Sequence, residues 1–120
     1  MRAWTWPAIL LGIAGCGDKD TADSAEVAAL CVDAPVVTWE NFGAGFISRE
    51  CQACHGSNAE NRNGAPEEVT FDAVNEVWFR ADEVIARAAG EDATMPPQGG
   101  IEADDRYKLE VWLTCAEEGS

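Results

Sequence analysis

Two thiols and an imidazole stand within five residues of each other in the stretch Cys-Gln-Ala-Cys-His, residues 51–55. Sulfur and imidazole nitrogen are soft or borderline ligands for transition metals. If the backbone here is helical, Cys51, Cys54 and His55 occupy positions i, i+3 and i+4, which share one face of a helix. All three side chains then point at one object, which has to be flat and contain a metal.

A haem meets this requirement, because its two vinyl groups can accept the thiols of Cys51 and Cys54 as thioethers while His55 reaches the iron. Cys-x-x-Cys-His is the attachment signature of c-type haem. In bacteria this attachment takes place outside the cytoplasm, so the motif is most specific in an exported chain. The motif predicts one covalently bound haem c per chain.

Two other sites can contain a closely spaced cysteine pair. A structural zinc site usually needs a second such pair, but Cys31 and Cys115 stand alone at opposite ends of the domain. A thioredoxin-like redox pair lies at the end of a strand before a helix, and no strand is indicated here. Both alternatives are less consistent with the sequence than haem is.

The first of three predicted helical segments leads into the motif. It begins at Thr38 and its pattern continues toward Cys51, while Gly43 and Gly45 leave room for a close neighbour. Its apolar side chains recur at helical spacing: Trp39, Phe42, Phe46 and Ile47.

The second segment can be capped by Thr70 or Asp72, is open to a break near residues 80–82, and ends at Gly90. Its apolar stripe consists of Val74, Val77, Trp78, Ala81, Val84, Ile85 and Ala88. The third segment covers residues 103–115, and its apolar set is Tyr107, Leu109, Trp112 and Leu113. No strand signal competes, so the fold is predicted to be all-α.

Size and charge limit the classes of partner. The chain has 120 residues, 47% of them hydrophobic, which indicates one small globular domain. Its formal net charge is -14, with 22 acidic residues against 8 Lys and Arg. Binding a polyanion requires a basic surface, so we expect no nucleic-acid partner.

Residues 1–15 have the features of an export signal. Arg2 supplies a positive start, and the apolar run that follows is too short to span a bilayer with ease. The ending Ile-Ala-Gly-Cys resembles the lipobox of bacterial lipoproteins, in which the cysteine, here Cys16, becomes the lipid-bearing first residue. The alternative is an ordinary signal peptide or short anchor in which Cys16 is incidental.

The rest of the N-terminal region, residues 16–30, is small, polar and acidic, and we expect a flexible tether. The folded domain then covers residues 31–120. The expected location is outside the cytoplasm, lipid-anchored to a bacterial membrane and facing the periplasm or the cell exterior.

Once Cys16 is assigned to lipid and Cys51 with Cys54 to haem, Cys31 and Cys115 remain as an even pair. In an oxidising compartment we expect them to form a disulfide. The alternative is two free, buried thiols.

With these features in order, the chain resembles the cytochrome c family, specifically the single-haem, class I-like domains of bacterial lipoproteins. The resemblance rests on CQACH, then NGAP, then TMPP, then DDRYKLEVWL, and covers about residues 39–115. It implies three to five helices around one haem. The first helix would cross the last, with Gly43 and Ile47 meeting Leu109 and Trp112.

The same resemblance implies the iron ligands. His55 would be the proximal ligand and Met95 the distal one, while the carbonyl of Pro66 or a neighbour would hold the second imidazole nitrogen. The mature chain has no other histidine and no other methionine, which also favours Met95. Its soft thioether would favour ferrous iron.

A haem with both axial positions filled moves single electrons and does not readily bind a substrate. The expected function is therefore that of a monomeric electron carrier whose redox partner has a basic docking face. If Met95 does not bind the iron, a five-coordinate haem could instead sense a gas or react with peroxide.

Overall fold

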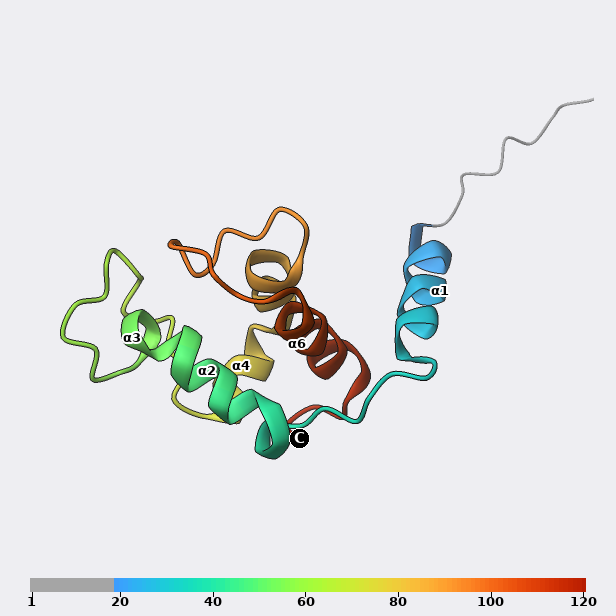
Figure 1. Ribbon diagram of the computed structural model, residues 1–120, viewed down its shortest axis with the longest axis horizontal. Coiled ribbons are helices and arrows are strands. Elements are labelled where there is room, and N and C mark those ends of the chain that lie inside the picture. Colours follow the sequence, from blue (N-terminus) through green and yellow to red (C-terminus); the bar gives the residue numbers. More distant parts are fainter. Residues whose placement is uncertain (1–18) are drawn as a thin grey trace, which may run out of the picture.

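A computed structural model describes residues 19–120, and in this part of the chain the secondary structure is helical with no strand (Figure 1). In chain order the elements are α1 (Lys19–Cys31), the π-helical η1 (Trp39–Gly43), α2 (Ala44–Glu50), α3 (Gln52–His55), α4 (Val74–Phe79), α5 (Ala81–Val84), the π-helical η2 (Ile85–Ala89) and α6 (Ala103–Cys115). The predicted all-α class is confirmed. The expected signal at residues 1–15 and the lipid-bearing Cys16 lie outside the described residues.

The first predicted helix corresponds to η1 and α2, which follow each other directly. Thr38 and Asn41 cap its start reciprocally: the Asn41 backbone N–H donates to the Thr38 hydroxyl at 3.2 Å, and the Thr38 N–H donates to the Asn41 side chain at 2.8 Å. The helix does not continue smoothly through the motif. Cys51 has φ -120° and ψ -40°, which interrupts it, and α3 begins at the next residue.

The second predicted helix corresponds to α4, α5 and η2, with the expected break at Arg80 and the expected end before Gly90. Neither Thr70 nor Asp72 occupies the cap position. Ala73 does, and it has no side-chain acceptor, so the carboxylate of Glu76 accepts the free backbone N–H groups instead.

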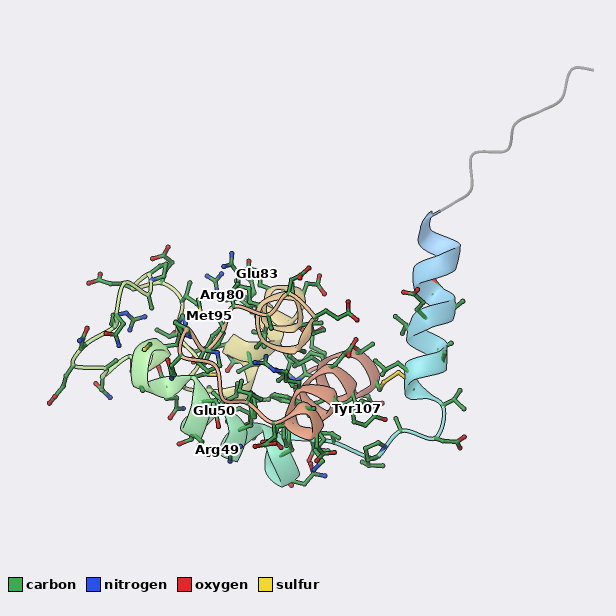
Figure 2. All side chains as sticks on the ribbon, turned by 45° about the horizontal axis from the view of Figure 1, so that its top comes forward. Arg49, Glu50, Arg80, Glu83, Met95 and Tyr107 are labelled. Carbon is green, nitrogen blue, oxygen red and sulfur yellow. A yellow bond between two sulfur atoms is a disulfide. The ribbon has the colours of Figure 1, made fainter. Side chains whose placement is uncertain are left out.

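Helix α6 covers the predicted residues and crosses η1 at Gly43 (Figure 1). A Cβ atom on Gly43 would lie 2.6 Å from the Trp112 ring, so only glycine allows this approach. Around this crossing is the apolar core of Val37, Phe46, Ile47, Phe71, Val77, Val84, Ala88, Leu109, Val111, Trp112 and Leu113. Tyr107, expected in the apolar set, is instead 41% exposed (Figure 2).

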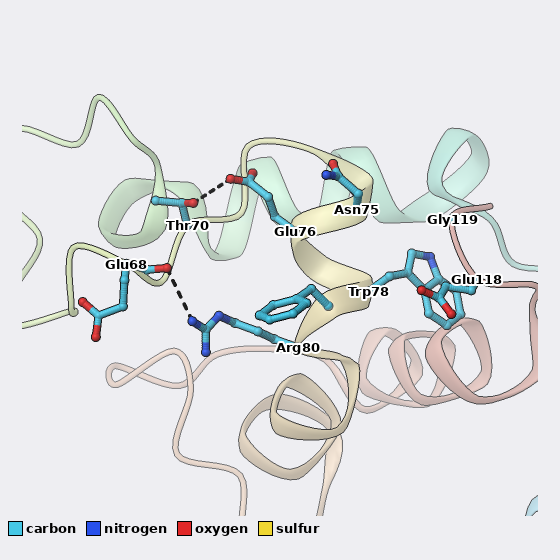
Figure 3. Close-up of a pocket in the computed structure, with 9 residues that line it drawn as sticks. Glu68, Thr70, Asn75, Glu76, Trp78, Arg80, Glu118 and Gly119 are labelled. Atoms are coloured by element: carbon cyan, nitrogen blue, oxygen red, sulfur yellow. Dashed lines mark hydrogen bonds between the residues drawn. The ribbon is translucent and has the colours of Figure 1, made fainter.

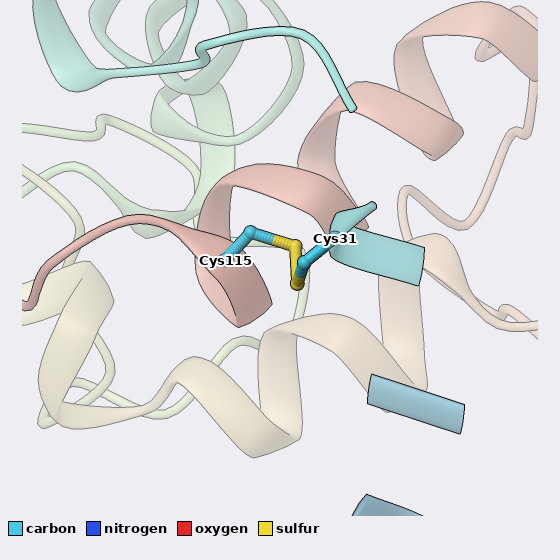
Figure 4. The surroundings of a disulfide bond; sticks show 2 residues. All are labelled: Cys31 and Cys115. Atoms are coloured by element: carbon cyan, nitrogen blue, oxygen red, sulfur yellow. A yellow bond between two sulfur atoms is a disulfide. The ribbon is translucent and has the colours of Figure 1, made fainter. Parts of the chain in front are cut away.

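The described part of the expected tether is not irregular, because residues 19–31 form α1. Its alanine content explains the difference, since alanine has the highest helix propensity and needs no apolar partner. Residues 24–29 are exposed, as a spacer would be. A disulfide between Cys31 and Cys115 joins the end of α1 to the end of α6, which is the pairing that the cysteine count predicted (Figure 4).

No helix within residues 19–120 combines the length and the apolar character that crossing a bilayer would require.

Candidate functional site

The Cys51–His55 motif forms a single helical turn despite the interruption before it. The Cys51 carbonyl accepts the backbone N–H of Cys54 at 3.2 Å and that of His55 at 2.9 Å. These bonds keep the three residues at positions i, i+3 and i+4 of one turn. The expected continuous helix is therefore wrong, but the grouping that it was meant to produce is present.

Cys51 has a free thiol that is half-buried and packs against the apolar core. Burial, with a smaller contribution from the charge of Glu50, raises the pKa of this thiol to about 12. At neutral pH the side chain is therefore the neutral thiol. Redox-active cysteines need the opposite shift, because the thiolate is the reactive form.

A zinc site is also disfavoured. Cys31 and Cys115 are consumed in the disulfide and offer no thiolate. Among the described side chains, residues 24–120, no three of His, Cys, Asp or Glu gather as a metal site would require. Thus neither of the two alternatives for the cysteine pair gains support from the geometry.

Cys54 is half-buried and contacts the loop that follows the motif. The side-chain amide of Asn63 lies 3.3 Å from its sulfur. Asn63 has φ 51° and Gly64 has φ 86°, so two consecutive left-handed residues return the loop toward Cys54. The sequence carried a signal for this turn in Asn-Gly, although the contact with Cys54 was not expected.

The imidazole of His55 is oriented by a backbone carbonyl. Its Nδ1 lies 3.0 Å from the carbonyl oxygen of Val69. A carbonyl can only accept, so Nδ1 carries a proton, and in the neutral imidazole Nε2 then has the lone pair that can bind a metal. The Phe71 ring lies beside it, with 5.1 Å between ring centroids.

The resemblance named the carbonyl of Pro66 or a neighbour for this role, and the Pro66 carbonyl accepts two other donors. It accepts the Val69 N–H at 3.1 Å and an Arg62 N–H at 2.8 Å. The turn closed by the first of these bonds brings the carbonyl of Val69, three residues later, to the histidine. The expected kind of contact is present, and Val69 makes it.

The end of the loop that follows the motif, at Phe71 and Asp72, is hydrogen-bonded to the motif and to the residue Ser57 just after it. The Phe71 N–H donates to the His55 carbonyl at 2.8 Å, and the Gln52 side chain donates to the Phe71 carbonyl at 3.0 Å. The Ser57 N–H donates to the Asp72 carboxylate at 3.1 Å. The acceptor for His55 is thus held in a closed loop.

Met95 lies on the segment between η2 and α6. Its backbone N–H donates to the Arg87 carbonyl at 2.8 Å, which fastens the segment to the end of η2. Its side chain is half-buried and packs against the same core as Cys51. In both overall views this segment and α3 lie on the same side of the molecule (Figures 1 and 2).

A separate hollow of about 760 Å³ lies beside α4, as Figure 3 shows. Its walls are largely polar and include Glu76 and Arg80, with the exposed ring of Phe79 at one side. The described residues that line it do not include Cys51, His55 or Met95. The hollow is therefore distinct from the candidate site.

Comparisons with protein-family models, with curated proteins and with solved structures found no match to the chain.

The candidate ligands are two thiols and one imidazole on a single turn, with one thioether on a second segment. Residue types alone did not reveal Val69, because every residue has a carbonyl. Residue types alone also did not reveal the contacts that Arg62 makes with the carbonyls of this loop.

Proposed function

We propose that the protein is a c-type cytochrome that carries one covalently attached haem and transfers single electrons outside the cytoplasm. In this proposal Cys51 and Cys54 hold the haem as thioethers, and His55 and Met95 are the axial ligands. The observation that carries the proposal is the Nδ1 contact of His55 with Val69, which leaves Nε2 available as a metal ligand on the same turn as two cysteines that form no disulfide.

The residues present fit such a group. A bound haem c would supply a one-electron iron centre. The Val69 carbonyl fixes the tautomer of His55 and increases its donor strength. Met95 offers an uncharged thioether that needs no deprotonation and favours the ferrous state. If His55 and Met95 both bind the iron, no position would remain on it for a substrate.

A cytochrome c-like fold is part of the proposal. It is supported by the helical class and by the contact of Gly43 on η1 with Trp112 on α6, which is the crossing that the family resemblance implies. The motif follows α2, which continues directly from η1, and Met95 precedes α6. The disulfide at Cys31 and Cys115 adds a brace to this arrangement.

The proposed location rests on the N-terminal sequence, with Cys16 as the lipid-bearing residue and a bacterial membrane as its anchor. Helix α1 would then act as a spacer of about 20 Å, at 1.5 Å per residue. A net charge of -14 implies a redox partner with a basic docking face. Their association rate should fall steeply as ionic strength rises.

The proposal is tested by expression in a host that exports the chain and attaches haem, followed by acid-acetone extraction. The wild type should keep its haem through extraction. The double variant Cys51→Ser with Cys54→Ser should lose all of it, because serine cannot form the thioethers. Haem that resists extraction in the double variant would overturn the proposal.

A further inference from the structure

Arg62 is the centre of the loop that follows the motif. Its guanidinium donates to the carbonyls of Gly56 at 2.8 Å, Ala65 at 3.3 Å, Pro66 at 2.8 Å and Val69 at 3.0 Å. Among the side chains of residues 24–120 no carboxylate forms an ion pair with it. The charge of Arg62 is therefore directed at backbone oxygens and not at an acidic side chain.

One of these oxygens is the acceptor that orients His55. The Val69 carbonyl receives both the imidazole Nδ1–H, at 3.0 Å, and the Nη2–H of Arg62, at 3.0 Å. A carbonyl has two lone pairs and can accept both bonds. The bond from a guanidinium is charge-assisted and draws electron density from the oxygen, so the oxygen becomes a weaker acceptor for the imidazole.

The strength of the hydrogen-bond acceptor that faces the Nδ1–H of an imidazole controls how strongly its Nε2 binds a metal. A strong acceptor gives the ring more imidazolate character and makes Nε2 a better ligand for ferric iron. A weakened acceptor does the reverse. The nearby positive charge adds to this effect, because ferric iron carries one more positive charge than ferrous iron.

We infer that Arg62 is a positioning residue that raises the reduction potential of the bound iron by sharing the Val69 carbonyl with His55. This inference rests on the proposed haem function and extends it to a residue that would act on the iron only through Val69 and His55. The same guanidinium also closes the loop through the carbonyls of Gly56 and Pro66. The position of the loop and the reduction potential of the iron would therefore both depend on one side chain.

Arginine suits this role better than lysine does. Its planar fork supplies five donors and can span several carbonyls, whereas lysine is a compact point charge on a flexible stem. Arg62→Lys keeps the charge but cannot make all four contacts. We expect a smaller change in potential in Arg62→Lys than in Arg62→Gln.

The experiment uses the full haem-loaded chain and measures the midpoint potential of wild type, Arg62→Gln and Lys108→Gln. The control removes one positive charge from α6, where Lys108 pairs with Asp104. Arg62→Gln should shift the ferric-to-ferrous equilibrium about tenfold toward ferric iron, which is about 59 mV for one electron. Lys108→Gln should leave the potential near that of the wild type.

A second readout separates tuning from a merely structural role. In the reduced protein, the NMR resonance of the His55 Nδ1–H should move downfield in Arg62→Gln, because its hydrogen bond to Val69 becomes stronger. Intact haem with an unchanged potential and an unchanged resonance would overturn the inference and leave the proposed function standing. A wild type without covalent haem would overturn both.

If Arg62→Gln fails to acquire haem, Arg62→Lys decides the question. A lower potential with a shifted Nδ1–H resonance in Arg62→Lys supports the inference. If the potential and the Nδ1–H resonance of Arg62→Lys equal those of the wild type, the hydrogen bond from Arg62 to the Val69 carbonyl has no influence on the iron, and the inference is wrong.

Discussion

The ring of Trp112 occupies the space that a side chain on Gly43 would need. A Cβ there would lie 2.6 Å from Cη2 and 2.8 Å from Cζ2, and Trp112 is fully buried and cannot move aside. Gly43→Ala should therefore separate η1 from α6 and lower the free energy of unfolding by about 1–3 kcal/mol. Denaturant unfolding followed by tryptophan fluorescence measures this loss.

Gly45, two residues further along the helix, provides the matched control. A Cβ on Gly45 would have no neighbour within 4 Å. Gly45→Ala should raise the free energy of unfolding, by up to about 1 kcal/mol, because alanine favours the helix more than glycine does. Equal effects of the two substitutions would show that the helices do not cross at Gly43.

The disulfide should contribute a large share of the stability of the domain. Cys31 and Cys115 are 84 residues apart in sequence, so the bond closes a long loop. By the chain-entropy argument its loss should cost about 4 kcal/mol, measured as the difference in unfolding free energy with and without reductant. Alkylation of both cysteines in the unreduced, unfolded protein would contradict the pairing.

The ionisation of the Glu76 carboxylate should make the free energy of unfolding depend on pH. Its carboxylate accepts the Thr70 hydroxyl at 2.7 Å and the N–H groups of Asp72 and Ala73 at 2.7 and 2.9 Å. The Thr70 bond is the main reason that the pKa of Glu76 lies below its ordinary value of 4.5. The stabilisation is present above that value and is lost as pH falls through the lowered pKa.

The substitution Glu76→Gln tests this dependence. At neutral pH it should cost about 1 kcal/mol at most, because the cap is solvent-accessible and water screens part of the effect. The difference in unfolding free energy between wild type and variant should shrink on acidification below the ordinary pKa. A difference that is the same at neutral and acidic pH would rule out the carboxylate as its source.

Much of the fold could be predicted from local patterns. The bounds of α6, the break at Arg80 and the end before Gly90 follow from hydrophobic periodicity and a helix stop, and the structure agrees with each. The motif itself predicted that Cys51, Cys54 and His55 share one turn. These features depend on nearest neighbours in sequence, which is why residue types sufficed.

The contacts that the sequence did not reveal are made by backbone atoms or across distant segments. The carbonyl of Val69 orients His55 because the turn after Pro66 brings it there. The valine side chain takes no part in this contact, so the residue type could not predict it. The helix is interrupted at Cys51 although no helix-breaking residue stands there. Helix α1 was overlooked because it has no apolar face to give a periodic signal.

Met95 should be the sixth ligand of the iron. Met95→Leu retains an apolar side chain of similar size against the core but removes the thioether. The reduced variant should bind carbon monoxide, and the oxidised variant should lose the weak long-wavelength band typical of thioether-bound haem iron. The absorption spectra of both oxidation states, with and without carbon monoxide, provide the measurement.

The wild type is the control for that experiment. With both axial positions filled by His55 and Met95, it should not bind carbon monoxide readily. Rapid binding by the wild type would instead favour a five-coordinate haem protein that senses a gas or reacts with peroxide.

The most direct test of the proposed cytochrome is the intact mass of the exported, denatured chain, measured after acid-acetone extraction and alkylation without reduction. We expect the mass of the mature polypeptide with its lipid plus one haem. No cysteine should be alkylated, because Cys51 and Cys54 would be thioethers in the proposed cytochrome and Cys31 and Cys115 are paired. A mass without haem, together with two alkyl groups on Cys51 and Cys54, would contradict covalent haem attachment.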